Sequence, residues 1–252
     1  MLKGKRGLVV GVANADSIAM GCAAKLRGFG ADIALTYLND KAFKHVQPLA
    51  EQLGAELLLP LDVTQPGQMQ SVFDAIQKHW GSLDFVIHSI AFAPKDDLHG
   101  RIVDCSQPGF LQAMQVSCHS FIEMAHCAEP LMNPGGALVT MSYYGSDKVV
   151  KNYNIMGPVK AALESSVRYM AAELGERDIR VYAVSPGPLR TRAASGIDHF
   201  DELIDMARTR APGHRLVDIA EVGRVVAFLV GGAASGMTGD IIYVDAGLHN
   251  VA

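Results

Sequence analysis

The chain has 252 residues, of which 49% are hydrophobic and 19% are charged, and its formal net charge at neutral pH is -4. This length and composition are typical of one α/β domain with a large apolar core. The acidic balance, without any basic tract, argues against nucleic acid as a partner. The apolar run near the N-terminus is too short to cross a membrane, so we expect no membrane partner.

The cysteine pattern favours a reducing compartment. Cys22, Cys105, Cys118 and Cys127 form no CxxC pair and no cluster with histidine at metal-ligand spacing. We therefore expect a cytoplasmic protein without a metal site.

Short apolar runs alternate with longer amphipathic stretches along the whole chain. We expect strands over residues 8–12, 32–37, 56–61, 83–88, 137–141, 179–184 and 241–244, and helices over 18–28, 41–53, 68–80, 110–131, 159–174 and 219–230. Several of the strands are continuously apolar, as in strands that are buried on both faces. The alternation predicts a single domain over residues 1–252, built on a Rossmann-like doubly wound parallel sheet of about seven strands.

The turn after the first expected strand is placed to bind the pyrophosphate of a dinucleotide. Gly11 can form the tight turn, and Ser17 precedes the helix as an N-cap or a phosphate ligand. Free backbone N–H groups and the positive end of the helix would face the ligand. The usual glycine fingerprint is incomplete, however, and a loop with an ordinary serine N-cap explains the segment equally well.

Two later strand ends bear on the choice of nucleotide. Leu38 and Asn39 follow the second strand and offer no arginine or lysine to a 2′-phosphate, which favours NADH over NADPH. Lys41 lies close by in the sequence and makes this preference mild. Asp62 and Val63 end the third strand, where a carboxylate can accept a hydrogen bond from an adenine amino group. A role for Asp62 as the N-cap of the next helix is an equal alternative.

Small and polar residues end the fourth expected strand. His88 is followed there by Ser89, Ile90 and Ala91. The backbone can pass close to a cofactor ribose at such a place. We expect His88 to be packed or hydrogen-bonded rather than catalytic.

Tyr153 and Lys160 are the candidate catalytic pair. A tyrosine hydroxyl can donate to a developing oxyanion, and a nearby ammonium can lower the pKa of that tyrosine and hold a sugar hydroxyl. Their separation of seven residues, at the start of an expected helix, predicts that they share one helix face. The commoner reductase arrangement has tyrosine four residues before lysine, where this chain has Met156. From spacing alone, a tyrosine that merely packs at a helix start is an equal alternative.

Residues 188–212 interrupt the alternation with a long connection that contains a short helical stretch near 200–208. A long insertion at this place in a compact domain predicts a lid or binding loop. A plain surface excursion is the alternative.

Together these motifs resemble the short-chain dehydrogenase/reductase superfamily, and most of all its divergent branch, the bacterial NADH-dependent enoyl-[acyl-carrier-protein] reductases. The resemblance covers essentially the whole chain. It rests on Gly11 with Ser17, Ile18 and Ala19; Thr36 and Tyr37 with Asn39, Asp40 and Lys41; Asp62 and Val63; the run from His88 to Ala93; Ser142 and Tyr143; the run from Asn152 to Gly157 with Lys160; the runs from Gly187 to Thr191 and from Ala193 to Gly196; Thr238 and Gly239; and Val244 and Asp245.

The resemblance implies roles for the matching residues. Tyr153 would hydrogen-bond the thioester carbonyl, Lys160 would bind the nicotinamide ribose, and Tyr143 would be a second active-site tyrosine or only a wall of an apolar pocket. Leu38 departs from the glutamine that the family often has at the adenosine ribose. The implied cofactor-binding residues are Gly11, Ser17, Ile18, Leu38, Asp62, Val63, Ser89, Ile90, Ala91, Lys160, Leu189 and Thr191, and the implied substrate-binding residues are Ala93, Tyr143, Tyr153 and Met156.

By this resemblance the chain reduces the trans-2 double bond of enoyl thioesters on an acyl carrier protein, with NADH, in fatty-acid elongation. Hydride goes to C3 while negative charge develops on the thioester oxygen, so the tyrosine must lie farther from the nicotinamide than in a ketone reductase. Three residues along a helix correspond to about 4.5 Å, which suits this need. A 3-ketoacyl or other carbonyl reductase would instead have tyrosine at position 156, and a non-catalytic nucleotide sensor would lack Tyr153 or Lys160.

The partners are expected from charge and from the resemblance. Arginines give the lid region a local positive charge: Arg190, Arg192, Arg208, Arg210 and Arg215. We expect part of this region to meet the acidic carrier protein, with ordinary solvated arginines as the alternative. Members of the family are usually homotetramers, which is expected here by resemblance alone.

Overall fold

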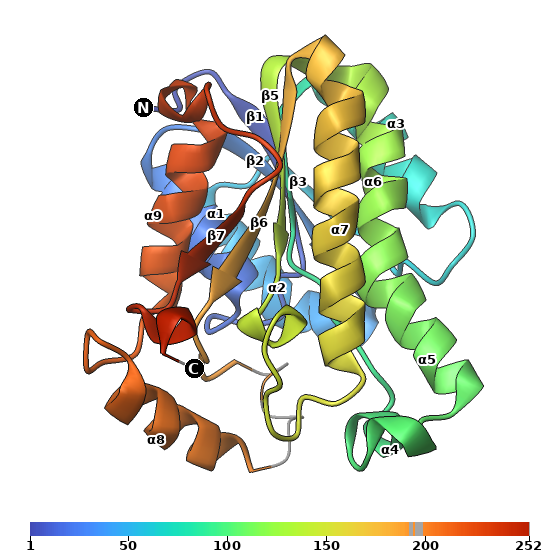
Figure 1. The fold of residues 1–252 in the computed structure, drawn as a ribbon. Coiled ribbons are helices and arrows are strands. Elements are labelled where there is room, and N and C mark those ends of the chain that lie inside the picture. The colour runs from blue at the N-terminus through green and yellow to red at the C-terminus, as the bar shows by residue number, and fades with distance from the viewer. Residues whose placement is uncertain (192–193, 195–198, 252) are drawn as a thin grey trace.

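The computed structural model describes residues 1–191, 194 and 199–251 (Figure 1). One parallel sheet has the strand order β3-β2-β1-β4-β5-β6-β7. The strands are β1 (Arg6–Val10), β2 (Asp32–Tyr37), β3 (Leu57–Pro60), β4 (Leu83–His88), β5 (Met132–Met141), β6 (Ile179–Pro186) and β7 (Ile241–Val244). The chain builds the sheet outward from β1 to β3 and then from β4 to β7 on the other side of β1. This confirms the predicted doubly wound sheet.

Helices cover both faces of the sheet (Figure 1). They are α1 (Ile18–Gly28), α2 (Asp40–Leu53), α3 (Gln68–Trp80), α4 (Lys95–Leu98), α5 (Gln107–Met114), α6 (Ser120–Ala128), α7 (Met156–Leu174), α8 (Phe200–Arg210) and α9 (Ile219–Val230). The core between α1, α2, α9 and the sheet is one cluster of buried apolar side chains, and the core under α3, α6 and α7 is another. Strands buried on both faces explain the continuous apolar runs of the sequence.

The main local difference from the expected elements lies in the segment 110–131. Instead of one regular helix, α5 and α6 are joined by a π-helical turn over Gln115–His119. A π turn inserts a residue into the helix and turns the side chains that follow it, and such turns are frequent at functional sites. The short helix α4 was not predicted, and α7 begins at Met156 rather than at residue 159.

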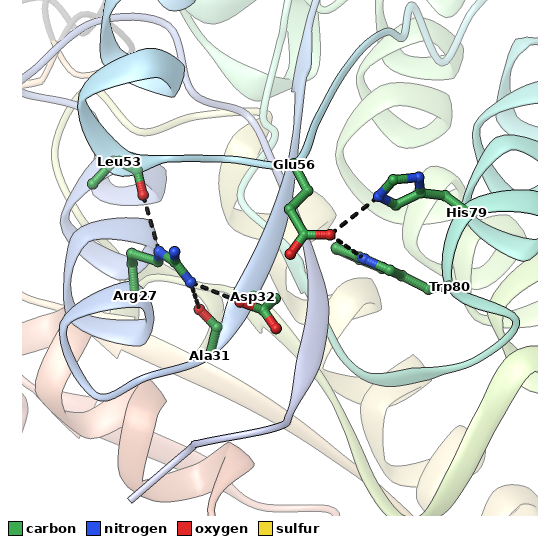
Figure 2. A network of polar contacts seen from close by, with 7 residues as sticks. All are labelled: Arg27, Ala31, Asp32, Leu53, Glu56, His79 and Trp80. Atoms are coloured by element: carbon green, nitrogen blue, oxygen red, sulfur yellow. Dashed lines mark hydrogen bonds and ion pairs between the residues drawn. The ribbon is translucent and has the colours of Figure 1, made fainter.

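Polar contacts join the amino ends of the strands (Figure 2). The Arg27 guanidinium donates to Asp32 at 2.7 Å and also to the carbonyls of Ala31 and Leu53. The Glu56 carboxylate, just before β3, accepts from the Trp80 indole at 2.7 Å and lies 3.1 Å from His79. These contacts tie the ends of α1 and α3 to the sheet, at the edge opposite the candidate site.

Candidate active site

The predicted site residues gather at the carboxyl edge of the sheet, around the place where the strand order reverses between β1 and β4. Gly11 follows β1, Ser89 follows β4, and Ser142 follows β5. In open α/β sheets the crevice at such a switch point is where ligands bind. The lower part of Figure 1 shows this edge, with α8 and α4 on its two sides.

The first turn has the geometry needed for a close backbone approach. Gly11 has φ 103°, and a Cβ on it would lie 2.1 Å from the carbonyl oxygen of Ser89, so only glycine fits. Ser17 is the N-cap of α1: its hydroxyl accepts from the N–H of Met20 and donates to the carbonyl of Asn14 at 2.8 Å. The capping role of Ser17 is confirmed, and its contact with a phosphate stays a prediction.

The polar side chains at the ends of β2 and β3 are both engaged in local hydrogen bonds. Leu38 is 56% exposed, while Asn39 is the N-cap of α2 and accepts from Ala42 at 3.0 Å. Asp62 accepts from both the N–H and the hydroxyl of Thr64 in a local turn. The next helix is capped at Gly67, so the alternative role of Asp62 as its N-cap is wrong.

His88 is buried and hydrogen-bonded, as predicted. Its Nδ1 lies 2.8 Å from the Thr140 hydroxyl, and its Nε2 lies 2.8 Å from the Ser120 hydroxyl. Because Ser120 donates its own proton to the Val116 carbonyl, it must accept from Nε2–H, and Thr140 must then donate to Nδ1. Burial, reinforced by the charge of Lys160, lowers the pKa of His88 to about 3. The ring is therefore neutral and structural.

Ser117, in the π turn, holds the segment that follows β4. Its hydroxyl accepts from the N–H of Phe92 at 2.9 Å and donates to the carbonyl of the same residue at 3.0 Å. One side chain thus satisfies both polar groups of a loop residue. Sequence reasoning missed Ser117, since nothing in a helical periodicity marks a π turn that redirects it.

Tyr153 does not lie on a helix. The prediction that Tyr153 and Lys160 share one helix face is therefore wrong. The estimate that the tyrosine is displaced by about 4.5 Å along a helix is wrong for the same reason. Tyr153 sits three residues before the first residue of α7, between Asn152 (φ 65°) and Asn154 (φ 42°). Asn154 donates to the carbonyl of Leu98 at 2.7 Å and so ties this turn to α4. Left-handed asparagines place the tyrosine where a helix would not.

The pKa of Tyr153 is raised by burial and secondarily by Glu164, which is the opposite of the expected lowering by lysine. The hydroxyl therefore stays protonated at neutral pH. It is a hydrogen-bond donor rather than a phenolate.

Three tyrosine rings pack together beside this turn. The Tyr143 ring lies 4.8 Å from Tyr153 and 4.7 Å from Tyr144, centroid to centroid. The Tyr143 hydroxyl is buried and has no hydrogen-bond partner in the described part of the chain. Burial, followed by the influence of Tyr144, raises the pKa of Tyr143. Gly145 makes this packing possible, because a Cβ on it would lie 2.6 Å from the Tyr153 ring.

Lys160 lies on α7 and is only 4% exposed. Its ammonium donates to the Met141 carbonyl at 2.7 Å, which uses one of its three donors. Burial lowers the pKa of Lys160 to about 8, and Cys118 and Glu164 partly offset this effect. The remaining donors suit a sugar hydroxyl, as the resemblance implies.

A buried carboxylate completes the polar groups of α7. Glu164, one turn after Lys160, is 7% exposed and accepts from the hydroxyls of Ser142 and Ser146, at 2.5 and 2.7 Å. Sequence reasoning missed Glu164. The available signal was an acidic residue on the buried face of a helix, four residues after the lysine.

The connection after β6 places Leu189 beside the first turn. Leu189 and Asp16 line the same cavity of about 290 Å³. The hydroxyl of Thr191 accepts from the N–H of Ala194 at 3.2 Å. Arg192, Ala193, Ser195 and Gly196 lie outside the described residues, so the expected lid is described only in part.

Helix α8 forms the longest described part of the lid. Its apolar residues Leu203 and Ile204 are buried, as on the core face of a helix. Three of the predicted arginines form ion pairs: Arg190 with Asp201 at 2.7 Å, Arg208 with Asp205 at 3.8 Å, and Arg215 with Glu221 at 2.7 Å. The positive charge of the region is therefore partly neutralised.

Among the described residues, no group of histidine, cysteine or carboxylate side chains is arranged to hold a metal ion. None of the described helices is both long and apolar enough to cross a membrane.

Known proteins resemble this chain over nearly its full length. A family model described as enoyl-(acyl carrier protein) reductase matches residues 11–249. The chain is 47% identical over 251 residues to enoyl-[acyl-carrier-protein] reductase [NADH] 1 of Rhizobium meliloti (strain 1021), covering 100% of this chain and 92% of that protein.

Solved structures agree with the family match. The reductase of Anaplasma phagocytophilum in complex with NAD is 45% identical, with a TM-score of 0.96 over 100% of this chain and 96% of that one. The Bacillus cereus reductase with NADP+ and indole naphthyridinone is 42% identical, with a TM-score of 0.97 over 100% of this chain and 98% of that one. At these identities the likeness extends beyond the fold.

Proposed function

Since the chain belongs to the enoyl-[acyl-carrier-protein] reductase family, we propose that it reduces the trans-2 double bond of enoyl thioesters on an acyl carrier protein, with NADH, in fatty-acid elongation. The observation that carries the proposal is the arrangement at the carboxyl edge. A buried, protonated Tyr153 and a buried Lys160 flank the switch point at which Gly11 allows a close backbone approach.

The chain's own residues fit a dinucleotide. The turn from Gly11 to Ser17 leads into the positive end of α1, and the absence of a Cβ on Gly11 lets this turn pack against the Ser89 carbonyl. Lys160 has donors to spare for the nicotinamide ribose, and Leu189 adjoins the first turn. Bound NADH would supply the hydride that is added to C3 of the enoyl chain.

Tyr153 donates a hydrogen bond to the thioester oxygen, on which negative charge develops as C3 is reduced. Its raised pKa keeps the proton on the hydroxyl until that charge appears. Tyr143 is proposed to contact the substrate as a second tyrosine, and its ring packs against that of Tyr153. Ala93 and Met156 are proposed to contact the acyl chain.

NADH is the proposed cofactor over NADPH because the β2 end offers little to a 2′-phosphate. Leu38 is apolar, the Asn39 side chain caps α2, and Asp40 adds negative charge. The NADP+ in the Bacillus cereus structure makes a direct comparison of the two cofactors necessary. Initial rates at equal concentrations of NADH and NADPH test this choice.

One assay separates the proposed function from its rivals. NADH oxidation is followed with crotonyl thioester and, separately, with acetoacetyl thioester. The proposal expects turnover of the crotonyl substrate only. Turnover of acetoacetyl thioester instead would indicate a carbonyl reductase, and NADH binding without turnover of either would indicate a nucleotide sensor.

The chain is also proposed to assemble as a homotetramer. Apolar side chains are exposed on three neighbouring helices: Phe110 and Leu111 on α5, Ile122 on α6 and Tyr169 on α7. Exposed apolar patches of this kind mark interaction surfaces. Sedimentation equilibrium tests the assembly, and a monomer at micromolar concentration would contradict it.

The acyl carrier protein is proposed to dock near α8. Arg210 is the arginine of this group that contacts only a backbone carbonyl, that of Val251, among the described contacts. Charge reversal of Arg208 and Arg210 should lower kcat/KM more with a carrier-protein substrate than with a coenzyme A analogue. An equal loss would contradict docking.

The cytoplasmic location stays a prediction from the cysteine pattern and the resemblance.

A further inference from the structure

We propose that Glu164 is a positioning residue of the reaction: its carboxylate fixes the segment that carries Tyr143 and places a negative charge one helical turn from Lys160. This inference rests on the proposed function, in which Tyr143 meets the substrate and Lys160 holds the cofactor ribose. Glu164 itself touches neither the substrate nor the cofactor in this proposal.

The contacts of the carboxylate carry the first half of the inference. Oε1 of Glu164 accepts from Ser142, directly after β5, and from Ser146, in the 3₁₀ turn that follows. These two serines bracket Tyr143 and Gly145. One buried oxygen on α7 therefore holds both ends of the segment that sets the Tyr143 ring against that of Tyr153. Hydrogen bonds to a charged acceptor are the stronger kind, which suits a rigid support.

The position of Glu164 on α7 carries the second half. Residues four apart lie on the same face of a helix, and both Lys160 and Glu164 are buried. An uncompensated buried ammonium is unfavourable, so a carboxylate on the same face supports the charged form. The charged form provides the stronger hydrogen-bond donors for a ribose.

The other groups that face Lys160 do not supply this charge. His88 on β4 is neutral, and Met141 on β5 offers a carbonyl. Burial raises the pKa of the Cys118 thiol, so this residue of the π turn stays uncharged at neutral pH and can support the Lys160 charge only at higher pH, where its thiolate forms. Tyr153 likewise stays protonated, because its pKa is raised.

The test compares four variants with the wild type in the full-length protein. Glu164→Gln removes the charge and keeps the shape, and Glu164→Asp keeps the charge. The double variant Ser142→Ala/Ser146→Ala removes the two hydroxyls and keeps the carboxylate. Glu173→Gln is the matched control, an exposed glutamate on the same helix. The readouts are the Kd for NADH from pH 6 to pH 10, kcat/KM with crotonyl thioester, and Tm.

The pH profile separates a positioning role from a merely structural one. Lys160 loses its proton as the pH rises through about 8, so NADH affinity should fall there in the wild type. Without the negative charge of Glu164 the proton is lost earlier, and in Glu164→Gln the fall should begin about one pH unit lower. Glu164→Asp and Glu173→Gln should keep the wild-type midpoint. The double serine variant should also keep it while losing kcat/KM several-fold.

Specific outcomes overturn the proposal. A wild-type midpoint in Glu164→Gln overturns the electrostatic role, whatever happens to Tm. Full kcat/KM in the double serine variant overturns the support of the Tyr143 segment. If Glu164→Gln does not fold, Glu164→Ala takes its place, and a wild-type midpoint in that variant overturns the electrostatic role as well. A wild type that binds NADH but leaves crotonyl thioester unreduced contradicts the proposed function alone, because the NADH titration still tests Glu164.

Discussion

The two edges of the sheet differ in which buried polar groups are left without a partner. At the amino edge charged side chains find partners: Arg27 meets Asp32, and Glu56 meets Trp80 and His79 (Figure 2). At the carboxyl edge the hydroxyls of Tyr143 and Ser185 are buried without a partner in the described chain. We therefore expect the amino edge to contribute mainly to stability and the carboxyl edge, where the proposed site lies, to contribute mainly to ligand binding.

Left-handed residues other than glycine occur at both edges. Asn152 and Asn154 flank Tyr153 and Ala246 follows β7 at the carboxyl edge, while Asp178 lies directly before β6 at the amino edge. Such conformations cost free energy and persist where the surrounding structure imposes them, often at functional sites. The comparison teaches that changes at the carboxyl edge should affect activity more than stability, and that changes at the amino edge should do the reverse.

The largest expected effect on activity is that of Tyr153→Phe, which removes the proposed oxyanion donor at the carboxyl edge. Loss of one such donor lowers kcat by about 100- to 1000-fold, whereas Tm should hardly change. Initial rates with crotonyl thioester and thermal unfolding measure the two effects. Tyr169→Phe, at an exposed tyrosine of α7, is the control. Full activity of the Tyr153 variant would remove the residue from the mechanism.

Gly145→Ala should move the Tyr153 ring without removing its hydroxyl. The added Cβ would lie 2.6 Å from the ring, so the ring must shift. A displacement of about 1 Å at a reacting group costs on the order of 100-fold in rate. Gly236→Ala, where a Cβ meets nothing within 4 Å, is the matched control. Equal rates in both variants would show that the position of the Tyr153 ring is not critical.

Glu56→Gln should weaken the polar contacts at the amino edge and so lower the stability of the fold. The pKa of Glu56 is lowered chiefly by the Trp80 hydrogen bond, against a smaller effect of burial, and further by His79 and Arg27. Because the pKa of Glu56 is lower in the folded state, its ionised carboxylate stabilises the fold at pH values above the ordinary pKa of 4.5. This contribution is lost as the pH falls through the folded-state pKa. Because the Glu56 and His79 side chains are partly exposed, we expect Glu56→Gln to lower the free energy of unfolding by about 1 kcal/mol at neutral pH.

Thermal unfolding from pH 3 to pH 8 checks this expectation. The Tm difference between Glu56→Gln and the wild type should narrow on acidification, and kcat should stay unchanged. Glu176→Gln, at an exposed glutamate, controls for the loss of one negative charge. A fall in kcat larger than the fall in stability would contradict the division between the two edges.

The smallest expected effect is that of Ala246→Gly. Ala246 has φ 57°, a conformation that costs an alanine about 1 kcal/mol or more, offset in part by the greater unfolded-state freedom of glycine. The variant should be more stable by about 0.5 kcal/mol, seen as a rise in Tm. A fall in Tm would show that the Ala246 methyl group contributes more by packing than its backbone costs.

Much of the fold could be predicted from the sequence because it depends on local patterns. Continuous apolar runs marked the buried strands, and glycines such as Gly54 and Gly81 marked helix ends, both in the left-handed conformation. The role of Gly11 in a tight turn followed from its place directly after the first strand. The expected helix face shared by Tyr153 and Lys160 failed, because periodicity gave no sign of the left-handed asparagines.

The tertiary structure decided the supporting groups of the site. Ser117 bonds Phe92 across 25 residues of sequence, and Glu164 bonds Ser142 across 22. His88 bonds Thr140 across 52 residues and Ser120 across 32. No short-range pattern specifies such pairs, since each forms only when separate elements pack at the carboxyl edge. The sequence by itself determined the layered fold and pointed to the tyrosine and lysine that are proposed to carry its chemistry. Packing alone determined how they are held, because burial and long-range hydrogen bonds set their protonation and orientation.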